Sequence, residues 1–128
     1  MKSYRDLDIC QESRQLAIEI HRMTLVLPKF ELFEEGGQIR SSSKAVVSAI
    51  VEGYGRKRYK QDFTRYLVYS QPECNETMLH LDFLFETGSL NDKALYDDFS
   101  ERYTRLSKKI NSFIQWVDKK WNSFPTSN

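Results

Sequence analysis

The apolar residues of this chain recur at alternating spacings of four and three, and this pattern constrains the fold more than any other feature. The clearest series comprises Phe63, Leu67, Ser70, Cys74, Thr77, Leu81 and Leu84. A later series comprises Phe99, Tyr103, Leu106, Ile110, Phe113 and Val117. Such spacing places side chains on one stripe of an α-helix, whereas a strand alternates at every second residue. The pattern therefore predicts amphipathic helices.

Breaks in this pattern divide the chain into four predicted helices. They are expected at residues 7–27, 37–55, 60–87 and 92–121, followed by a frayed tail at 122–128. Pro28 ends the first helix, and Gly53 and Gly55 weaken the second near its end. The periodicity continues in phase across Pro72, so one kinked helix is predicted there rather than two. Asn91 is the predicted N-cap of the fourth helix.

Four amphipathic helices with short connections predict an all-α fold, an antiparallel up-down-up-down four-helix bundle. The chain has 128 residues, of which 40% are hydrophobic and 29% charged. This length allows one modest core, so residues 1–128 are predicted to form a single domain. The shallow helix crossing of a bundle also suits an apolar stripe with this spacing.

The cysteines and the start of the chain bear on its location. Cys10 and Cys74 both lie on apolar helical stripes, which predicts buried free thiols rather than a disulfide framework. The first residues lack the apolar core of a signal peptide, and no apolar run reaches membrane-spanning length. A cytoplasmic protein without a membrane association is expected.

Charge is segregated along the chain although the formal net charge is only +1. Residues 40–65 contain seven basic and two acidic side chains, and residues 66–101 contain one basic and eight acidic side chains. Tyrosines interleave with the cations, and arginine binds phosphate while tyrosine stacks on unpaired bases. The candidate nucleic-acid-binding residues are Arg40, Lys44, Arg56, Lys57, Arg58, Lys60 and Arg65. Alternatively, these cations pair with the acidic residues 66–101.

No catalytic, metal or cofactor site is predicted. His21 and His80 lack neighbours at metal-ligand spacing, so no metal ligand is expected. Residues 41–43 are serines without a base partner. The glycines near residue 54 follow a helix rather than a strand and lack the ending of a phosphate-binding loop. The sequence therefore predicts a protein that is not an enzyme.

The third and fourth predicted helices carry more apolar side chains than one buried face requires. The additional residues are Tyr66, Tyr69, Phe83, Tyr96, Ile114, Trp116, Trp121 and Phe124. A surplus of this size on a small bundle indicates a subunit interface. A homo-oligomer is therefore expected.

The segment QIRSSSKAVVSAIVEGYGR closely resembles the signature of the 23S rRNA-intervening-sequence family of four-helix-bundle proteins. The matching residues are Gln38, Ile39, Arg40, Ser48, Ile50, Glu52, Gly53, Tyr54, Gly55 and Arg56. Further matches are Leu7, Gln11, Leu16, Thr24, Pro28, Glu31, Phe63, Leu67 and Glu76. The chain departs from the family pattern at Ala49, at Pro72 and Glu73, and at residues 35–37.

This resemblance implies a non-enzymatic bacterial bundle that forms a ring-like homopentamer. The family includes accessory proteins of diversity-generating retroelements, which bind nucleic acid and a reverse transcriptase. The resemblance thus implies RNA or DNA, and a reverse transcriptase or another nucleic-acid enzyme, as partners. The alternative is a protein–protein assembly module, in which the basic residues meet residues 66–101 of a neighbouring subunit.

Overall fold

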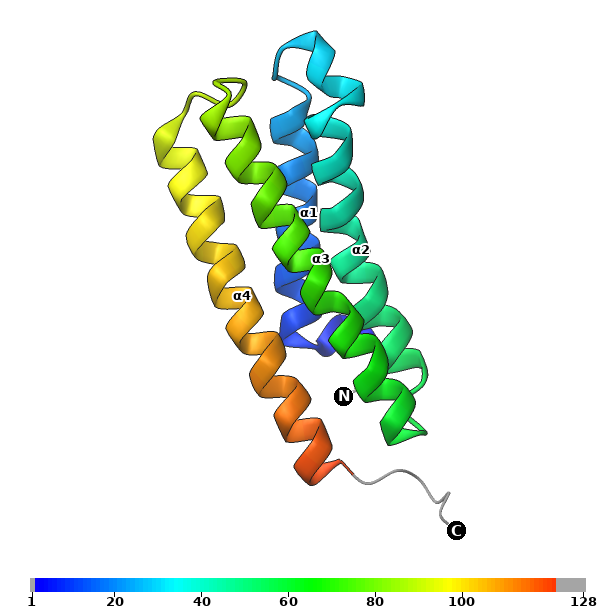
Figure 1. Cartoon of the computed structure of the whole chain (residues 1–128). Coiled ribbons are helices and arrows are strands. Elements are labelled where there is room, and N and C mark those ends of the chain that lie inside the picture. Colours follow the sequence, from blue (N-terminus) through cyan, green and yellow to red (C-terminus); the bar gives the residue numbers. More distant parts are fainter. Residues whose placement is uncertain (1, 122–128) are drawn as a thin grey trace.

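The computed structural model describes residues 2–121, and this part of the chain is helical without any strand. Its elements are η1 (Tyr4–Asp6), α1 (Asp8–Thr24), η2 (Lys29–Phe33), α2 (Glu35–Gly55), α3 (Lys60–Glu86) and α4 (Lys93–Lys120). Successive long helices run in opposite directions, with α3 between α2 and α4 (Figure 1). The predicted all-α four-helix bundle in a single domain is therefore confirmed. The predicted frayed tail, residues 122–128, lies outside the described residues.

The ends of the helices differ from the predicted ones by more than one residue in two places. The first helix ends at Thr24, and the short helix η2 precedes α2, which begins at Glu35 rather than at residue 37. The prediction that Asn91 caps the fourth helix is wrong by one residue. The side chain of Asp92 accepts a hydrogen bond of 3.1 Å from the Leu95 amide, as an N-cap aspartate does.

Helix α3 continues through Pro72 as one element. A proline in a helix interior removes the hydrogen bond to the carbonyl four residues earlier, here that of Val68. Both Pro72 and Val68 are exposed, so water can replace the missing donor. The predicted single helix across this proline is confirmed.

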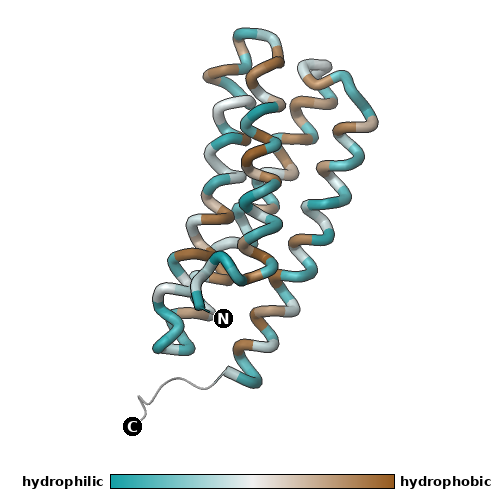
Figure 2. Tube along the Cα trace, turned by 180° about the vertical axis from the view of Figure 1, so that it is seen from behind, coloured by the Kyte–Doolittle hydropathy of each residue, from teal (hydrophilic) through white to brown (hydrophobic). Residues whose placement is uncertain are grey.

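The core is formed by the residues of the periodic stripes. Every member of the α3 series is buried, as are the members of the α4 series except Phe113, which is partly buried. Figure 2 shows apolar positions recurring along each helix between hydrophilic ones. Cys10 and Cys74 are free and buried, as predicted, and burial raises the pKa of the Cys74 thiol to about 11. Neither thiol is therefore a ready nucleophile.

Helices α2 and α3 form the most extensive contact of the bundle. A Cβ atom built on Gly53 would lie 3.2 Å from the Phe63 carbonyl oxygen and 3.2 Å from the Tyr66 Cβ. At Gly55, a Cβ atom would meet nothing within 4 Å. The absence of a side chain at Gly53 is thus what lets the two helices approach just before the turn that joins them.

A bilayer-spanning helix needs about 20 consecutive apolar residues. Between residues 2 and 121, no helix combines that length with sufficient apolar character.

Candidate nucleic-acid interface

The seven predicted nucleic-acid-binding residues fall into two groups in the structure. Arg40 and Lys44 lie in the first half of α2, beside α1. The other five belong to the connection between α2 and α3, and these are Arg56, Lys57, Arg58, Lys60 and Arg65. The helical rise of 1.5 Å per residue places Lys44 about 18 Å from Arg56 along α2. We call the five residues of the second group the basic turn.

The basic turn combines cations with aromatic rings. The Arg56 guanidinium lies 4.7 Å from the centre of the Tyr66 ring, and the Lys57 ammonium lies 4.2 Å from the centre of the Tyr54 ring. Cations over ring faces are held by the ring quadrupole. Tyr59 follows them with 56% of its surface exposed. An aromatic side chain is therefore available to a ligand beside the cations.

Some of these cations already have carboxylate partners. Arg56 Nε lies 2.9 Å from Glu52 Oε2, an ion pair that raises the pKa of Arg56. Arg65 lies 3.2 Å from Asp62. Arg58 is exposed and has no hydrogen bond or ion pair with a described residue. Its charge is the one in the turn that is most available to a partner.

The last described residue fixes the backbone of the basic turn. Trp121 Nε1 donates a hydrogen bond of 2.9 Å to the Lys57 carbonyl oxygen. The indole also packs edge-on against Phe63, with ring centres 5.2 Å apart. The end of α4 thereby holds the turn in place, so its cations are presented by a supported backbone.

Several acidic residues of the segment 66–101 have partners outside the basic turn. Asp82 accepts a hydrogen bond from Tyr96, Asp97 pairs with Lys93, and Asp98 pairs with Arg102. Arg56 and Arg65 of the basic turn pair instead with Glu52 and Asp62, which lie outside this segment.

Arg40 has a structural role that its position in the sequence did not reveal. Its guanidinium donates hydrogen bonds to Thr24 Oγ1 at 2.9 Å and to the Leu32 carbonyl oxygen. It therefore ties α2 to the end of α1 and to η2, and less of its hydrogen-bonding capacity remains for a ligand.

The structure adds cations from α1 that the sequence analysis missed. A groove between α1 and α2, with a volume of about 480 Å³, is lined by Arg14, Ala17, Ile18, His21, Arg22, Lys44, Val47 and Ser48. We call it the α1–α2 groove. His21 and Arg22 follow Arg14 by seven and eight residues, which places all three on one face of a helix. That spacing could have predicted a basic face on this helix, but the acidic residues of the same segment offset its net charge.

Those acidic residues lie on the other flank of α1, against α4. Arg102 binds Glu19 through both guanidinium nitrogens at 2.7 Å. Lys109 lies 2.6 Å from Glu12 and 3.3 Å from Asp8. Helix α1 therefore has an acidic flank that is paired with α4 and a basic flank that faces α2.

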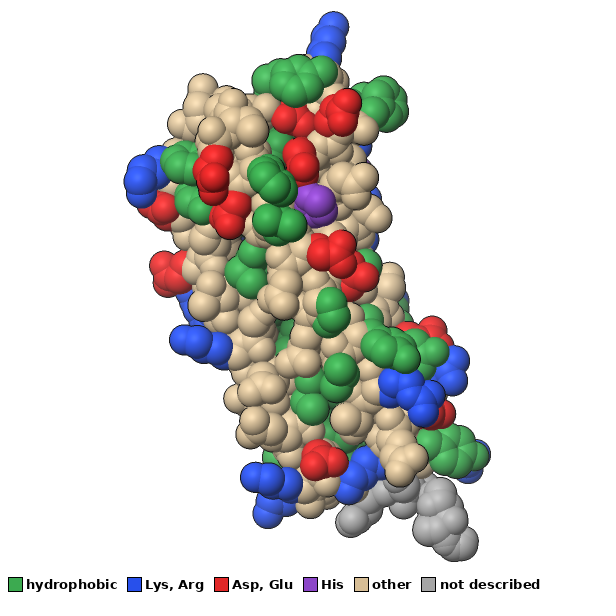
Figure 3. Space-filling model, in the orientation of Figure 1, with side chains coloured by type: hydrophobic (Ala, Val, Ile, Leu, Met, Phe, Trp, Pro, Cys, Tyr) green, Lys and Arg blue, Asp and Glu red, His purple; other side chains and the backbone are tan. Residues whose placement is uncertain are grey.

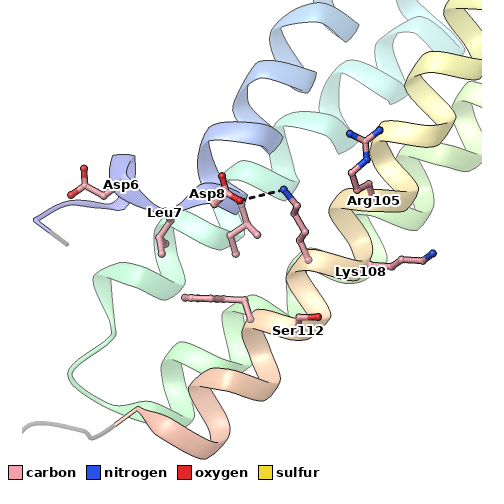
Figure 4. Close-up of a pocket in the computed structure, with 9 residues that line it drawn as sticks. Asp6, Leu7, Asp8, Arg105, Lys108 and Ser112 are labelled. Carbon is pink, nitrogen blue, oxygen red and sulfur yellow. Dashed lines mark hydrogen bonds and ion pairs between the residues drawn. The ribbon is translucent and has the colours of Figure 1, made fainter.

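A second hollow lies between the beginning of α1 and α4 and has a volume of about 570 Å³ (Figure 4). It carries charges of both signs, since Asp6 and Asp8 line it together with Arg105, Lys108 and Lys109 of α4. The ammonium of Lys109 pairs with Asp8, while Lys108 extends away from it (Figure 4). This partial neutralisation makes the hollow a weaker site for an anion than the α1–α2 groove.

Both histidines have neighbours that the sequence did not indicate. His80 Nδ1 lies 2.6 Å from Glu35 Oε2, and His21 Nδ1 lies 3.0 Å from Lys44 Nζ. Within residues 2–121, no three His, Cys, Asp or Glu side chains are grouped so as to hold a metal ion.

The fold and these surfaces define a single-domain, antiparallel four-helix-bundle protein with cationic surfaces on α1, α2 and the turn that follows. The family model of the 23S rRNA-intervening sequence protein matches residues 5–112, and the chain belongs to that family.

Comparison with solved structures supports the same fold. One match is the crystal structure of a protein of unknown function from the S23 ribosomal protein family of Bacteroides thetaiotaomicron. The two chains share 22% sequence identity and superpose with a TM-score of 0.75, over 84% of this chain and 95% of that one. No match was found among the curated proteins.

Proposed function

We propose that this protein is a non-enzymatic scaffold that binds single-stranded nucleic acid through the basic turn. The observation that carries the proposal is the exposed pair Arg58 and Tyr59, which follows the cations Arg56 and Lys57. A guanidinium binds phosphate with several donors, and an exposed tyrosine stacks on an unpaired base. The expected partner is RNA or DNA in the cytoplasm, alone or together with a reverse transcriptase or another nucleic-acid enzyme.

The proposal includes a homo-oligomer, a pentamer by resemblance to the family. Exposed apolar side chains on the outer face of α3 support it, and these are Val68, Tyr69, Leu79 and Phe83. Figure 3 shows apolar side chains along the middle of this face. An oligomer repeats the basic turn in every subunit, so several turns act on one strand and strengthen its binding.

The experiment measures binding of a fluorescent single-stranded RNA by anisotropy at increasing salt concentration. The logarithm of the binding constant should fall with the logarithm of salt, with a slope of roughly −0.7 for each phosphate neutralised. Arg58→Glu should weaken binding without unfolding the protein, because Arg58 has no partner among the described residues. Lys108→Glu on α4 is the matched control, since it makes the same charge change at another exposed site. Absence of binding at low salt would disprove the proposal.

A second candidate function is a protein assembly module without nucleic acid. Figure 3 favours it, because acidic side chains gather mostly toward the upper end of the α3 face and basic ones toward the lower end. A neighbouring subunit could therefore place its basic turn against acidic residues 66–101. In that case, combined Arg56→Glu, Lys57→Glu and Arg58→Glu changes should lower the mass measured by light scattering, and the wild-type protein should not bind RNA.

A further inference from the structure

The two sides of α1 differ in how their charges are matched. Toward α4, Glu19 and Glu12 meet Arg102 and Lys109 at ion-pair distances. Toward α2, cations of α1 face a cation of α2, and no carboxylate is among the residues that line the α1–α2 groove. Like charges across a helix pair destabilise it, whereas opposite charges stabilise it. An anion in the α1–α2 groove would remove this repulsion.

The contact between Lys44 and His21 fixes the charge state of the His21 ring. An ammonium can only donate hydrogen bonds, so the His21 Nδ1 atom 3.0 Å away must accept, and the ring must be neutral. The surroundings of the ring favour this neutral form. Lys44 makes the largest contribution to lowering the pKa of His21, and burial, Arg40 and Arg22 act in the same direction. Arg14 lines the same groove.

The floor and size of the groove suit one part of a nucleotide chain. Ala17, Ile18 and Val47 provide an apolar floor, and Ser48 adds a hydroxyl at the edge. The volume of about 480 Å³ lies within the range of small-molecule sites, which is about 300–1,000 Å³. An apolar floor with a cationic rim complements a sugar or base that carries a phosphate.

We propose that the α1–α2 groove is a second binding site for single-stranded nucleic acid, in which Arg14, Arg22 and Lys44 bind backbone phosphate. This inference rests on the proposed function, because the same strand reaches the groove from the basic turn along about 18 Å of α2. His21 is the fourth contact, and it binds phosphate in its protonated form.

Binding in the groove is therefore coupled to proton uptake. A phosphate beside His21 offsets the field of the three cations, so the pKa of the ring rises when the strand binds. Between the lower pKa of the free protein and the higher pKa of the complex, the complex holds more protons. Affinity consequently increases as the pH falls through this window.

The first measurement compares variants in RNA binding, with a short oligouridylate as the probe. Combined Arg14→Gln and Arg22→Gln changes should weaken binding and reduce the salt slope by roughly 0.7 for each cation removed. Combined Lys108→Gln and Lys119→Gln changes are the matched control, since they remove the same charge from exposed positions on α4. His21→Gln should abolish the increase in affinity between about pH 7.5 and about pH 5.5.

The second measurement follows both histidine rings by NMR as a function of pH. The oligouridylate should raise the pKa of His21, whereas the NMR signals of His80, which pairs with Glu35, should not respond to the strand. Oligouridylate binding that is insensitive to the Arg14 and Arg22 changes would overturn the groove site while the proposed function stands. If the wild-type protein fails to bind the oligouridylate, the proposed function fails. In that case, a titration with inorganic phosphate that still raises the pKa of His21 would indicate that the groove binds a small phosphate ligand rather than a strand.

Discussion

Glu19 and Arg102 form a bidentate ion pair that contributes to the stability of the contact between α1 and α4. The guanidinium of Arg102 makes two parallel hydrogen bonds of 2.7 Å to the carboxylate of Glu19, and Asp98 adds a third contact at 3.1 Å. Arg102 lowers the pKa of Glu19 to about 2. This pair joins α1 to α4, which otherwise have a smaller contact than α2 and α3.

Replacing Glu19 with glutamine should lower the free energy of unfolding by about 1 kcal/mol at neutral pH. Because the folded-state pKa of Glu19 is depressed, its contribution is complete above the unfolded-state pKa of about 4.5. It disappears as the pH falls toward about 2. Urea unfolding at a series of pH values should therefore show the two proteins converging in acid.

Glu101→Gln serves as the control for this experiment. Glu101 pairs with Arg105 at 3.0 Å within one helix, and both side chains are largely exposed. Its loss should change stability by no more than about 0.5 kcal/mol. An equal effect of the two substitutions would contradict the special role of the Glu19 pair.

The close approach of α2 and α3 near the turn that joins them depends on the missing side chain of Gly53. Gly53→Ala should destabilise the protein by about 1–3 kcal/mol, because the new methyl group meets the Phe63 carbonyl at 3.2 Å and neither backbone can easily move. Gly55→Ala should instead stabilise it by up to about 1 kcal/mol, since alanine favours the helix and the site is open. Thermal and urea unfolding measure both changes. Equal effects at the two glycines would disprove the packing argument.

Helices were the part of this fold most accessible to prediction. The stripe from Phe63 to Leu84 is buried along its whole length, because residues that repeat at the helical period all lie on the same face of the helix. Their ends were less accessible. Asn91 and Asp92 are both good N-cap residues, and only the path of the chain after Gly88 decides between them.

The outer face of α3 bears on the assembly of the whole molecule. Combined Leu79→Ser and Phe83→Ser changes should lower the oligomer mass, because these exposed apolar side chains are proposed to lie between subunits. Light scattering at fixed protein concentration measures the mass. Phe33→Ser is the control, since Phe33 is 87% exposed and belongs to η2 rather than to α3. A wild-type monomer, or a mass that the α3 changes leave unaltered, would refute the interface.

The candidate site was only partly accessible from the sequence. The cluster from Arg56 to Lys60 is contiguous, so its charge is visible in the chain and the structure keeps it together at one turn. Arg40 belongs to the same charged stretch, yet its hydrogen bonds to Thr24 and Leu32 give it a structural role. Arg14 and Arg22 were missed because Asp8, Glu12 and Glu19 offset their charge in the sequence, whereas in the structure these carboxylates face α4.

The sequence by itself determined the four helices, the buried stripes and the family, because helical period and local motifs are properties of neighbouring residues. The tertiary structure alone decided which charges neutralise one another. It pairs the acidic flank of α1 with α4 and places the basic flank against Lys44. Electrostatic pairing depends on distance in space, and residues such as Glu12 and Lys109 meet only when the bundle forms.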